Sequence, residues 1–207
     1  MKENKQVKKD FLQIRDGKII QLVPEKSETS KTFETKTGRK FEAEVYTNLV
    51  SNIKYLQIFE DEFDGITYKK ISVTMCDNEN NWECLTMSFN SNVGSSLICR
   101  LSNSEFQPLQ ESNIGVFKDK DGFDVLFVKQ NGITIKSPFS ASNPLPKWIE
   151  TKVNKKIVWD KSEYLDKLES LVEDINKRLK FEPETMTAIN PITRTDESLL
   201  LVDDMPF

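Results

Sequence analysis

The chain contains no histidine, and this absence excludes much of the usual chemistry of enzymes. Without an imidazole there is no Ser-His or Cys-His nucleophile pair, and the commonest general base near neutral pH is missing. The sequence also has no apolar run long enough to cross a bilayer, and its first residues, MKENKQVKKD, lack the apolar core of a secretion signal. We therefore expect a non-catalytic protein of the cytoplasm.

Cysteine is scarce as well, with only Cys76, Cys84 and Cys99 in 207 residues. An odd number of cysteines without histidine offers no obvious set of four zinc ligands. All three fall in segments that resemble strands, so we interpret them as small residues of the core or the sheet. We expect neither a metal nor another cofactor.

Charge is unevenly divided along the sequence. The net charge of the whole chain is −4, and the residues from Pro183 onward carry that entire excess. The first 182 residues have equal numbers of acidic and basic side chains, so a basic face exists only if the charges are sorted in space. The charged residues of the last segment are Glu184, Arg194, Asp196, Glu197, Asp203 and Asp204.

Four of the seven glycines follow Asp or Asn, at Gly17, Gly65, Gly122 and Gly132. Such pairs accept positive φ angles and favour tight hairpin turns between antiparallel strands. Alternating segments surround them, and there is no proline between Pro24 and Pro108. The first 150 residues therefore predict an antiparallel barrel or sandwich with added hairpins.

One amphipathic helix is predicted near the C-terminus, within residues 151–182. Asp160 and Glu163 form a capping-box pattern, and apolar residues then recur at steps of three and four. We expect this stripe to pack on the barrel; a short dimerising coiled coil is the alternative. Periodicity ends at Pro183, and residues 183–207 have the composition of a disordered acidic tail.

Strand alternation places several aromatic and basic side chains on the side opposite the packing residues. Aromatic rings can stack on bases and cations can follow phosphates, so such a face suits single-stranded nucleic acid. In the segment SLICRL, read as a strand, the basic residue would lie opposite the leucines. The candidate contacts are Lys40, Tyr46, Tyr55, Tyr68, Lys70, Trp82 and Arg100.

The chain ends in LLLVDDMPF, which is poorly suited to a final strand because two Asp interrupt it and Pro206 lacks a ladder donor. As a free peptide it offers a terminal ring, a carboxylate and two further acids to an apolar pocket with a basic rim. Asp203, Asp204, Met205, Pro206 and Phe207 together resemble the acidic tip of bacterial single-stranded DNA-binding proteins.

The resemblance covers only these five residues, and the body sequence and linker differ from the bacterial proteins. With a helix before the tail, the chain is more similar to bacteriophage-type single-stranded DNA-binding proteins. That similarity implies an OB-like fold in residues 1–150 that coats single-stranded DNA during replication, recombination or repair. It further implies a tip that recruits replication and repair proteins, and a location in the host cytoplasm if the protein is viral. The oligomeric state stays open.

The charge division suggests a regulatory hypothesis. The acidic tail is expected to occupy the DNA-binding face when DNA is absent, so removing its last nine residues should tighten binding.

Three other functions rival the coating of single-stranded DNA. The first rival is a metal-dependent nuclease, for which Glu34 and Lys36 supply a Glu-x-Lys pattern without an upstream Pro-Asp partner. The others are an annealing or recombination-mediator protein and an adaptor that does not bind DNA.

Overall fold

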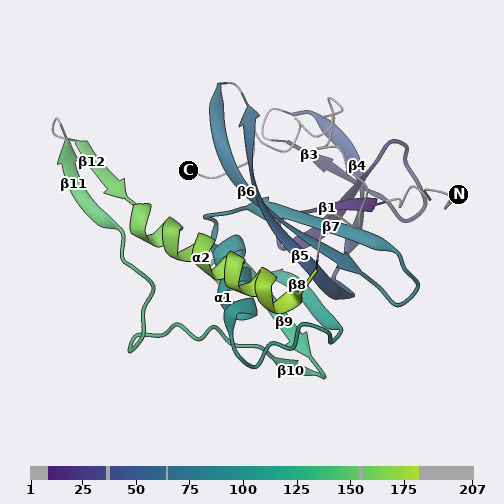
Figure 1. Cartoon of the computed structure of the whole chain (residues 1–207). Helices are drawn as coiled ribbons and strands as arrows, with labels where there is room; N and C mark the ends of the chain where they lie inside the picture. Colours follow the sequence, from purple (N-terminus) through teal and green to yellow (C-terminus); the bar gives the residue numbers. More distant parts are fainter. Residues whose placement is uncertain (1–8, 36–37, 64, 154–155, 182–207) are drawn as a thin grey trace, which may run out of the picture.

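The computed structural model describes residues 9–35, 38–63, 65–153 and 156–181, and the fold below refers to these residues. They form a mainly β structure with two helices (Figure 1). The strands are β1 (Lys9–Arg15), β2 (Lys18–Val23), β3 (Lys31–Glu34), β4 (Lys40–Tyr46), β5 (Asn48–Phe63), β6 (Ile66–Cys76), β7 (Trp82–Ser88), β8 (Ser112–Lys118), β9 (Asp124–Gln130), β10 (Ile133–Thr134), β11 (Ile149–Val153) and β12 (Lys156–Asp160). The helices are α1 (Asn92–Ser102) and α2 (Ser162–Leu179).

Ten strands form one curled sheet in the order β10-β9-β8-β5-β6-β7-β1-β2-β4-β3, which resembles half of a barrel in Figure 1. The tight turns predicted from Asp-Gly and Asn-Gly pairs are confirmed, since Gly17, Gly65, Gly122 and Gly132 all have positive φ angles between paired strands. The expectation of a purely antiparallel sheet was wrong, because β1 pairs with β7 in parallel.

The long strand β5 joins the two halves of the curled sheet. Its first residues, Asn48 to Ser51, pair with β8, and the remainder pairs with β6. A register shift between Ile53 and Tyr55 marks the change of partner, which is how a bulge bends a strand from one sheet direction into another. The curl brings the β1–β2 turn against β8, where a Cβ at Gly17 would lie only 2.8 Å from the Lys118 nitrogen.

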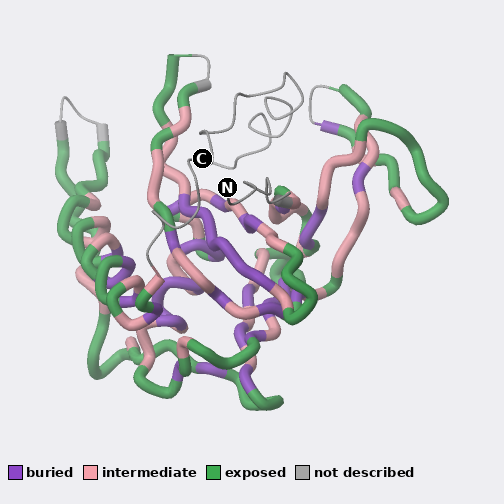
Figure 2. Tube along the Cα trace, turned by 45° about the vertical axis from the view of Figure 1, so that its right-hand side comes forward, coloured by how far each residue is buried: buried purple, intermediate pink, exposed green. Residues whose placement is uncertain are grey.

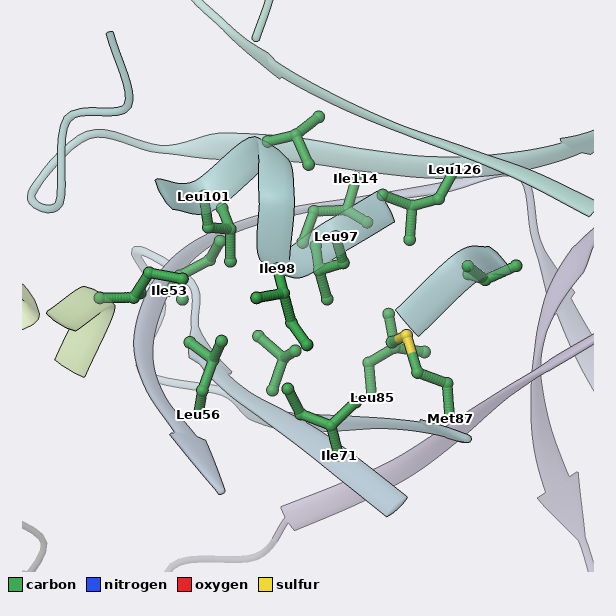
Figure 3. Packing of buried hydrophobic residues seen from close by; sticks show 14 of the residues in the cluster. Ile53, Leu56, Ile71, Leu85, Met87, Leu97, Ile98, Leu101, Ile114 and Leu126 are labelled. Carbon is green, nitrogen blue, oxygen red and sulfur yellow. The ribbon is translucent and has the colours of Figure 1, made fainter. Parts of the chain in front are cut away.

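The hydrophobic core fills the space between the curled sheet and the two helices. Figure 3 shows Leu97, Ile98 and Leu101 of α1 among side chains of the strands. The apolar stripe of α2 belongs to the same core, with Leu168, Val172, Ile175 and Leu179 buried. The helix therefore packs on the sheet as predicted. Its apolar stripe is buried within the chain and is not exposed for a dimerising coiled coil.

Side chains of α2 also fix it to the exposed edge of β5. The Asn176 side-chain amide accepts from the Leu56 nitrogen (2.9 Å) and donates to the Leu56 carbonyl (2.8 Å). Lys69 of the neighbouring strand β6 forms an ion pair with Glu169. The helix thereby pairs with a strand edge that would otherwise present open backbone groups.

The first helix corrects the expectation of a single helix. The whole segment SLICRL, residues 96–101, interpreted above as a strand, belongs to α1. The Ser91 hydroxyl caps this helix by accepting from the Gly94 nitrogen (3.0 Å), and a Cβ at Gly94 would lie 2.3 Å from the Ser88 carbonyl. A side chain at position 94 would therefore force α1 away from the end of β7.

The described residues bear on the predictions about membrane-spanning helices and about the cysteines. Within the described chain, no helix combines the length and apolarity needed to cross a membrane. No disulfide joins the three cysteines, which are buried; Cys76 and Cys84 lie in strands as predicted, whereas Cys99 lies in α1. Burial raises the pKa of the Cys99 thiol to about 11. The acidic tail, residues 183–207, lies outside the described residues.

Candidate nucleic-acid interface

The sheet has a face that points away from the core. Along β6, Ile71, Val73 and Met75 enter the core cluster, so the alternating residues between and beyond them project to the opposite side. We call this opposite side of β5, β6, β7 and β1, together with its continuation across β2, β4 and β3, the outer face. Its residues on β6 are Tyr68, Lys70, Ser72, Thr74 and Cys76.

Strand register brings aromatic residues of three strands onto the outer face. Tyr55 is opposite Thr74, and Trp82 is opposite Cys76 at the other side of β6. Phe59 is opposite Lys70 further along the β5–β6 hairpin. The aromatic residues thus flank a stripe of small side chains on β6, and Ser72, Thr74 and Cys76 in this stripe are buried.

Phe181 adds a third ring to the aromatic pair. Lys180 takes a left-handed conformation at the end of α2, and the next residue reaches the outer face. The Phe181 ring centroid lies 6.1 Å from that of Trp82 and 6.5 Å from that of Tyr55. These spacings and tilted planes are usual for packed aromatic side chains. The result is a cluster of three rings drawn from β5, β7 and the end of α2.

A second aromatic cluster lies on the outer face near the edge of the sheet. Phe33 and Phe41 are opposite each other on β3 and β4, and their rings stack with centroids 5.6 Å apart. The Arg15 guanidinium carbon lies 5.0 Å from the Phe41 ring centroid, and one of its nitrogens donates to the Glu34 carbonyl (2.9 Å). Arg15 therefore combines a cation–π contact with a fixed orientation.

Charges are sorted between the two faces of the sheet. Lys18 pairs with Arg15 in register and Lys31 with Ala43, which sets them on the outer face. Lys54 lies at the bulge of β5 and has no register partner on β6. The described charged residues that strand register places on the outer face are Arg15, Lys18, Lys31, Lys70 and Asp61.

The single described carboxylate of that set is paired. Lys70 Nζ lies 2.6 Å from an Asp61 oxygen, and both side chains are less than one fifth exposed. On the other side of β3 and β4 the balance is reversed, with Glu34, Glu42, Glu44 and Lys40 sharing one face. The neutral body predicted from the sequence therefore has a basic outer face.

Four predicted contact residues lie on the outer face, Tyr55 and Trp82 near one end of β6 and Tyr68 and Lys70 toward the other. Tyr55, Tyr68, Lys70 and Trp82 have the orientation that strand alternation indicated, and all four are half-buried. Among the described residues, neither helix covers this face, because α1 and α2 pack on the core side. Whether these residues contact DNA stays a prediction.

Tyr46 and Lys40 require a correction. Strand alternation in β4 was predicted correctly, but the side containing Tyr46 is the core side, and its ring packs against the core cluster. The Tyr46 hydroxyl lies 2.8 Å from Gln21 Oε1 and 3.0 Å from Glu44 Oε2. Burial, followed by the hydrogen bond to Glu44, raises the pKa of Tyr46 to about 12.

Lys40 shares this orientation and lies 4.0 Å from a Glu34 oxygen in an exposed ion pair. The sequence interpretation took the side of β4 that contains Ala43 as the core side. Ala43 is indeed fully buried, but it lies on the outer face, opposite the side that packs on the core cluster. Ala43 and Ile20 have no accessible surface, and neither belongs to the core cluster.

Arg100 also lies elsewhere than predicted. It is part of α1, where its guanidinium donates to the Ile135 carbonyl (2.7 Å) and to the Ser96 hydroxyl (3.2 Å). These bonds connect the helix to the segment after β10. The strand interpretation failed because Leu97, Cys99 and Leu101 alternate as in a strand, yet all three are also buried in a helix that is apolar on most of its circumference.

Several residues of the outer face were missed by the sequence interpretation. Arg15 and Phe41 have no motif around them, and strand register alone reveals their common side. Phe181 gave only a weak signal, an apolar residue just after a helix end, where such residues often fold back onto the protein. The tip residues Asp203 to Phe207 lie outside the described residues.

The Glu-x-Lys pattern of the nuclease rival is only partly described. Within the described segments, no group of three or more Cys, Asp or Glu side chains is arranged to hold a metal ion. Glu34 is exposed on β3, and Lys36, the other half of its motif, lies outside the described residues.

Comparison with known proteins gives no relative. No protein-family profile, no curated protein and no solved structure matches the chain.

Proposed function

We propose that this protein binds and coats single-stranded DNA through the outer face of its sheet. The observation that carries the proposal is the cluster of Tyr55, Trp82 and Phe181 on a basic face that neither helix covers. Aromatic rings stack on bases of any sequence, and the surrounding cations follow the phosphates. A coating protein needs this combination, because it must bind a strand irrespective of its sequence.

The connectivity of five strands supports an OB-like assignment for the centre of the fold. The strands β5, β6 and β7 form a meander, α1 follows, and β8 returns to pair with the first part of β5 before β9. A five-stranded Greek-key barrel of this kind binds oligonucleotides on the face of its second and third strands. In this chain those strands are β6 and β7, which contribute Tyr68, Lys70 and Trp82.

The C-terminal tip is the proposed site of partner recruitment. Asp203, Asp204, Pro206 and Phe207 provide the acids, the constrained backbone and the terminal ring that the resemblance assigns to docking of replication and repair proteins. Phe181, the last described residue, lies on the outer face beside Tyr55 and Trp82, and the acidic segment follows it in the sequence. This origin supports the hypothesis that the tail competes with DNA for the same face. The proposed role places the protein in the cytoplasm, or in the host cytoplasm if it is viral.

A binding titration tests the proposal. Labelled oligo-dT and a matched duplex are titrated with the full-length protein at low and moderate salt, and anisotropy is recorded. We expect a strong preference for the single strand that weakens steeply as salt rises, because neutralised phosphates release their counterions. The titration is repeated with residues 199–207 removed, so that tail competition cannot hide binding.

Two outcomes would direct the function elsewhere. Absence of binding at low salt by both forms would contradict the proposal and leave an adaptor that acts through its tip. Rapid pairing of complementary strands on addition of the protein would instead indicate an annealing or recombination-mediator role. That second outcome retains the outer face as the DNA site and changes only what the bound strand is used for.

A further inference from the structure

The β11–β12 hairpin stands apart from the rest of the protein. It forms its own two-stranded sheet at the N-terminal end of α2, away from the ten-stranded sheet (Figure 1). Its base is held by Trp148, whose ring lies edge-on to Tyr164 with centroids 6.0 Å apart, and Lys161 Nζ lies 4.0 Å from the Trp148 centroid. The sequence did not predict this hairpin.

Its strands expose large apolar side chains to an unusual degree. On β12, Ile157, Val158 and Trp159 follow one another and are 55%, 49% and 49% exposed, and Ile149 on β11 is 52% exposed. The described part of both strands is drawn as exposed in Figure 2. An isolated two-stranded hairpin is only marginally stable in water, and an apolar edge strand is a template for further pairing.

The pairing within the hairpin determines which backbone groups point outward. Val153 is opposite Lys156 across a two-residue loop, and such a pair exchanges both of its hydrogen bonds. Bonded and non-bonded pairs alternate in antiparallel strands, so Val158 directs its N–H and C=O toward Thr151. The outward backbone groups of β12 therefore belong to Ile157 and Trp159.

The sequence of β12 is complementary to itself in antiparallel orientation. With Val158 at the centre, Ile157 falls opposite Trp159 of the second strand, and Lys156 falls opposite Asp160. Each of these pairings occurs twice because the arrangement is symmetric. The outward backbone groups of Ile157 and Trp159 meet in this register, which provides four hydrogen bonds across the pair. Charge, apolar pairing and hydrogen bonding thus agree on one register.

We propose that β12 pairs with β12 of a second copy of this chain, around a twofold axis at Val158. The product is a four-stranded sheet in the order β11, β12, β12 and β11. On one side of it, Trp159 and Ile157 of the two copies form an apolar group flanked by Glu150 and Lys152. Opposite charges and aromatic–aliphatic neighbours across strands both favour pairing. This inference is independent of DNA binding.

The other open edge is the weaker candidate. The strand β11 is also self-complementary about Thr151, with Glu150 opposite Lys152. However, the outward backbone groups of β11 belong to these two charged residues, and charged side chains on an edge strand oppose pairing with another chain. The three consecutive exposed apolar residues are on β12, so pairing through β12 removes more apolar surface from water.

Sedimentation velocity on the full-length protein over a concentration series tests the proposal. Because two five-residue strands make a small interface, we expect a reversible dimer with a dissociation constant on the order of 1–100 μM. In Val158→Lys two cations face each other at the axis, and we expect at least about a tenfold weaker dimer. Thr151→Lys places the same charge opposite Val158 on β11, one strand away from the axis, and should leave the dimer intact.

Oxidative cross-linking gives a positive readout. Val158 is a non-hydrogen-bonded pair with itself across the axis, where Cα atoms lie about 4.5 Å apart, within the range that disulfides span. Val158→Cys should therefore form a covalent dimer on mild oxidation, whereas Thr151→Cys should not. The three native cysteines are buried and provide the background control in the unmodified protein.

Three results would overturn the proposal. They are an unmodified protein that remains monomeric throughout the concentration series, a dimer that survives Val158→Lys, and a dimer that Thr151→Lys disrupts while Val158→Lys does not. The last result would assign the contact to β11. Because the hairpin lies outside the core, circular dichroism should be unchanged in all four variants, which confirms that lost association does not reflect unfolding.

Discussion

The ring of Phe181 lies 6.1 Å from that of Trp82 and is inclined to it by 49°. The two residues lie 99 positions apart in the sequence, since Trp82 begins β7 and Phe181 follows α2. The helix packs on the core side of the sheet, yet the residue after its end reaches the outer face. Packing of the helix therefore fixes one component of the proposed DNA-binding surface.

Trp82→Ala should weaken binding of oligo-dT without unfolding the protein. The indole is half-buried on the outer face, and loss of one base-stacking ring costs roughly 1–3 kcal/mol, or about 5- to 150-fold in affinity. Anisotropy titration at moderate salt measures the change. Tyr46→Phe is the matched control, because Tyr46 faces the core side and should not contact DNA.

A DNA affinity that falls equally in both variants would point to a general loss of folding. An unchanged affinity in Trp82→Ala, with the protein folded, would remove the aromatic cluster from the proposed interface.

Removal of residues 199–207 should tighten DNA binding at low salt. The deleted segment contains Asp203 and Asp204, and the last described residue, Phe181, lies on the outer face. If these acids compete with phosphates for the basic face, their removal frees the site, and added salt should reduce the difference by screening. The titration compares the full-length chain with the shortened one, and a chain with Asp203→Asn and Asp204→Asn separates charge from length. Equal affinities of all three at low salt would contradict the competition.

The hairpins of the sheet were predictable because local chemistry determines them. Asp16 and Gly17 both have positive φ angles, and Asn131 and Gly132 repeat the pattern, as tight turns between antiparallel strands require. The apolar stripe of α2 was predictable for a similar reason, since its spacing matches the helical period.

Features that depend on distant residues were not predictable. The parallel pairing of β1 with β7 joins segments about 70 positions apart, and no local pattern encodes such pairing. Arg100 was misplaced because a short buried helix and a strand can have the same apolar pattern. In the candidate site, alternation correctly grouped Tyr68 with Lys70 and Tyr46 with Lys40, but it cannot tell which side of a sheet receives the helices.

Alkaline titration should distinguish Tyr46 from an ordinary tyrosine. Its pKa is raised to about 12 from the usual 10 because burial and the neighbouring Glu44 disfavour the phenolate. A raised pKa means that the stabilising contribution is complete below about pH 10, the unfolded value, and is lost as pH rises through 12. Tyrosinate absorbance should therefore include a late component that is absent in Tyr46→Phe. The variant should also lose less stability between pH 10 and 12 than the unmodified protein. A titration curve identical in both proteins would contradict this assignment.

Arg178 should be the residue of α2 whose polar contacts contribute most to stability. Its guanidinium donates to the carbonyls of Leu101, Ser102, Asn103 and Phe106 at 3.1, 3.3, 3.0 and 2.6 Å, at the C-terminal end of α1. Positive charge at a helix C-terminus is favourable, and hydrogen bonds to charged groups are stronger than neutral ones.

Arg178→Ala leaves these carbonyls without their donor, and we expect a loss of about 2–3 kcal/mol in the free energy of unfolding. That corresponds to a melting temperature lower by about 5–10 °C in a domain of this size. Lys177→Ala is the matched control, because Lys177 is exposed and its ion pair in the described residues is with Asp174, its neighbour on the same helix, at 3.0 Å. Thermal unfolding followed by circular dichroism compares the two. If both variants melt together with the unmodified protein, Arg178 does not join the helices in solution; if both fall equally, the effect belongs to helix propensity and not to the contact between α1 and α2.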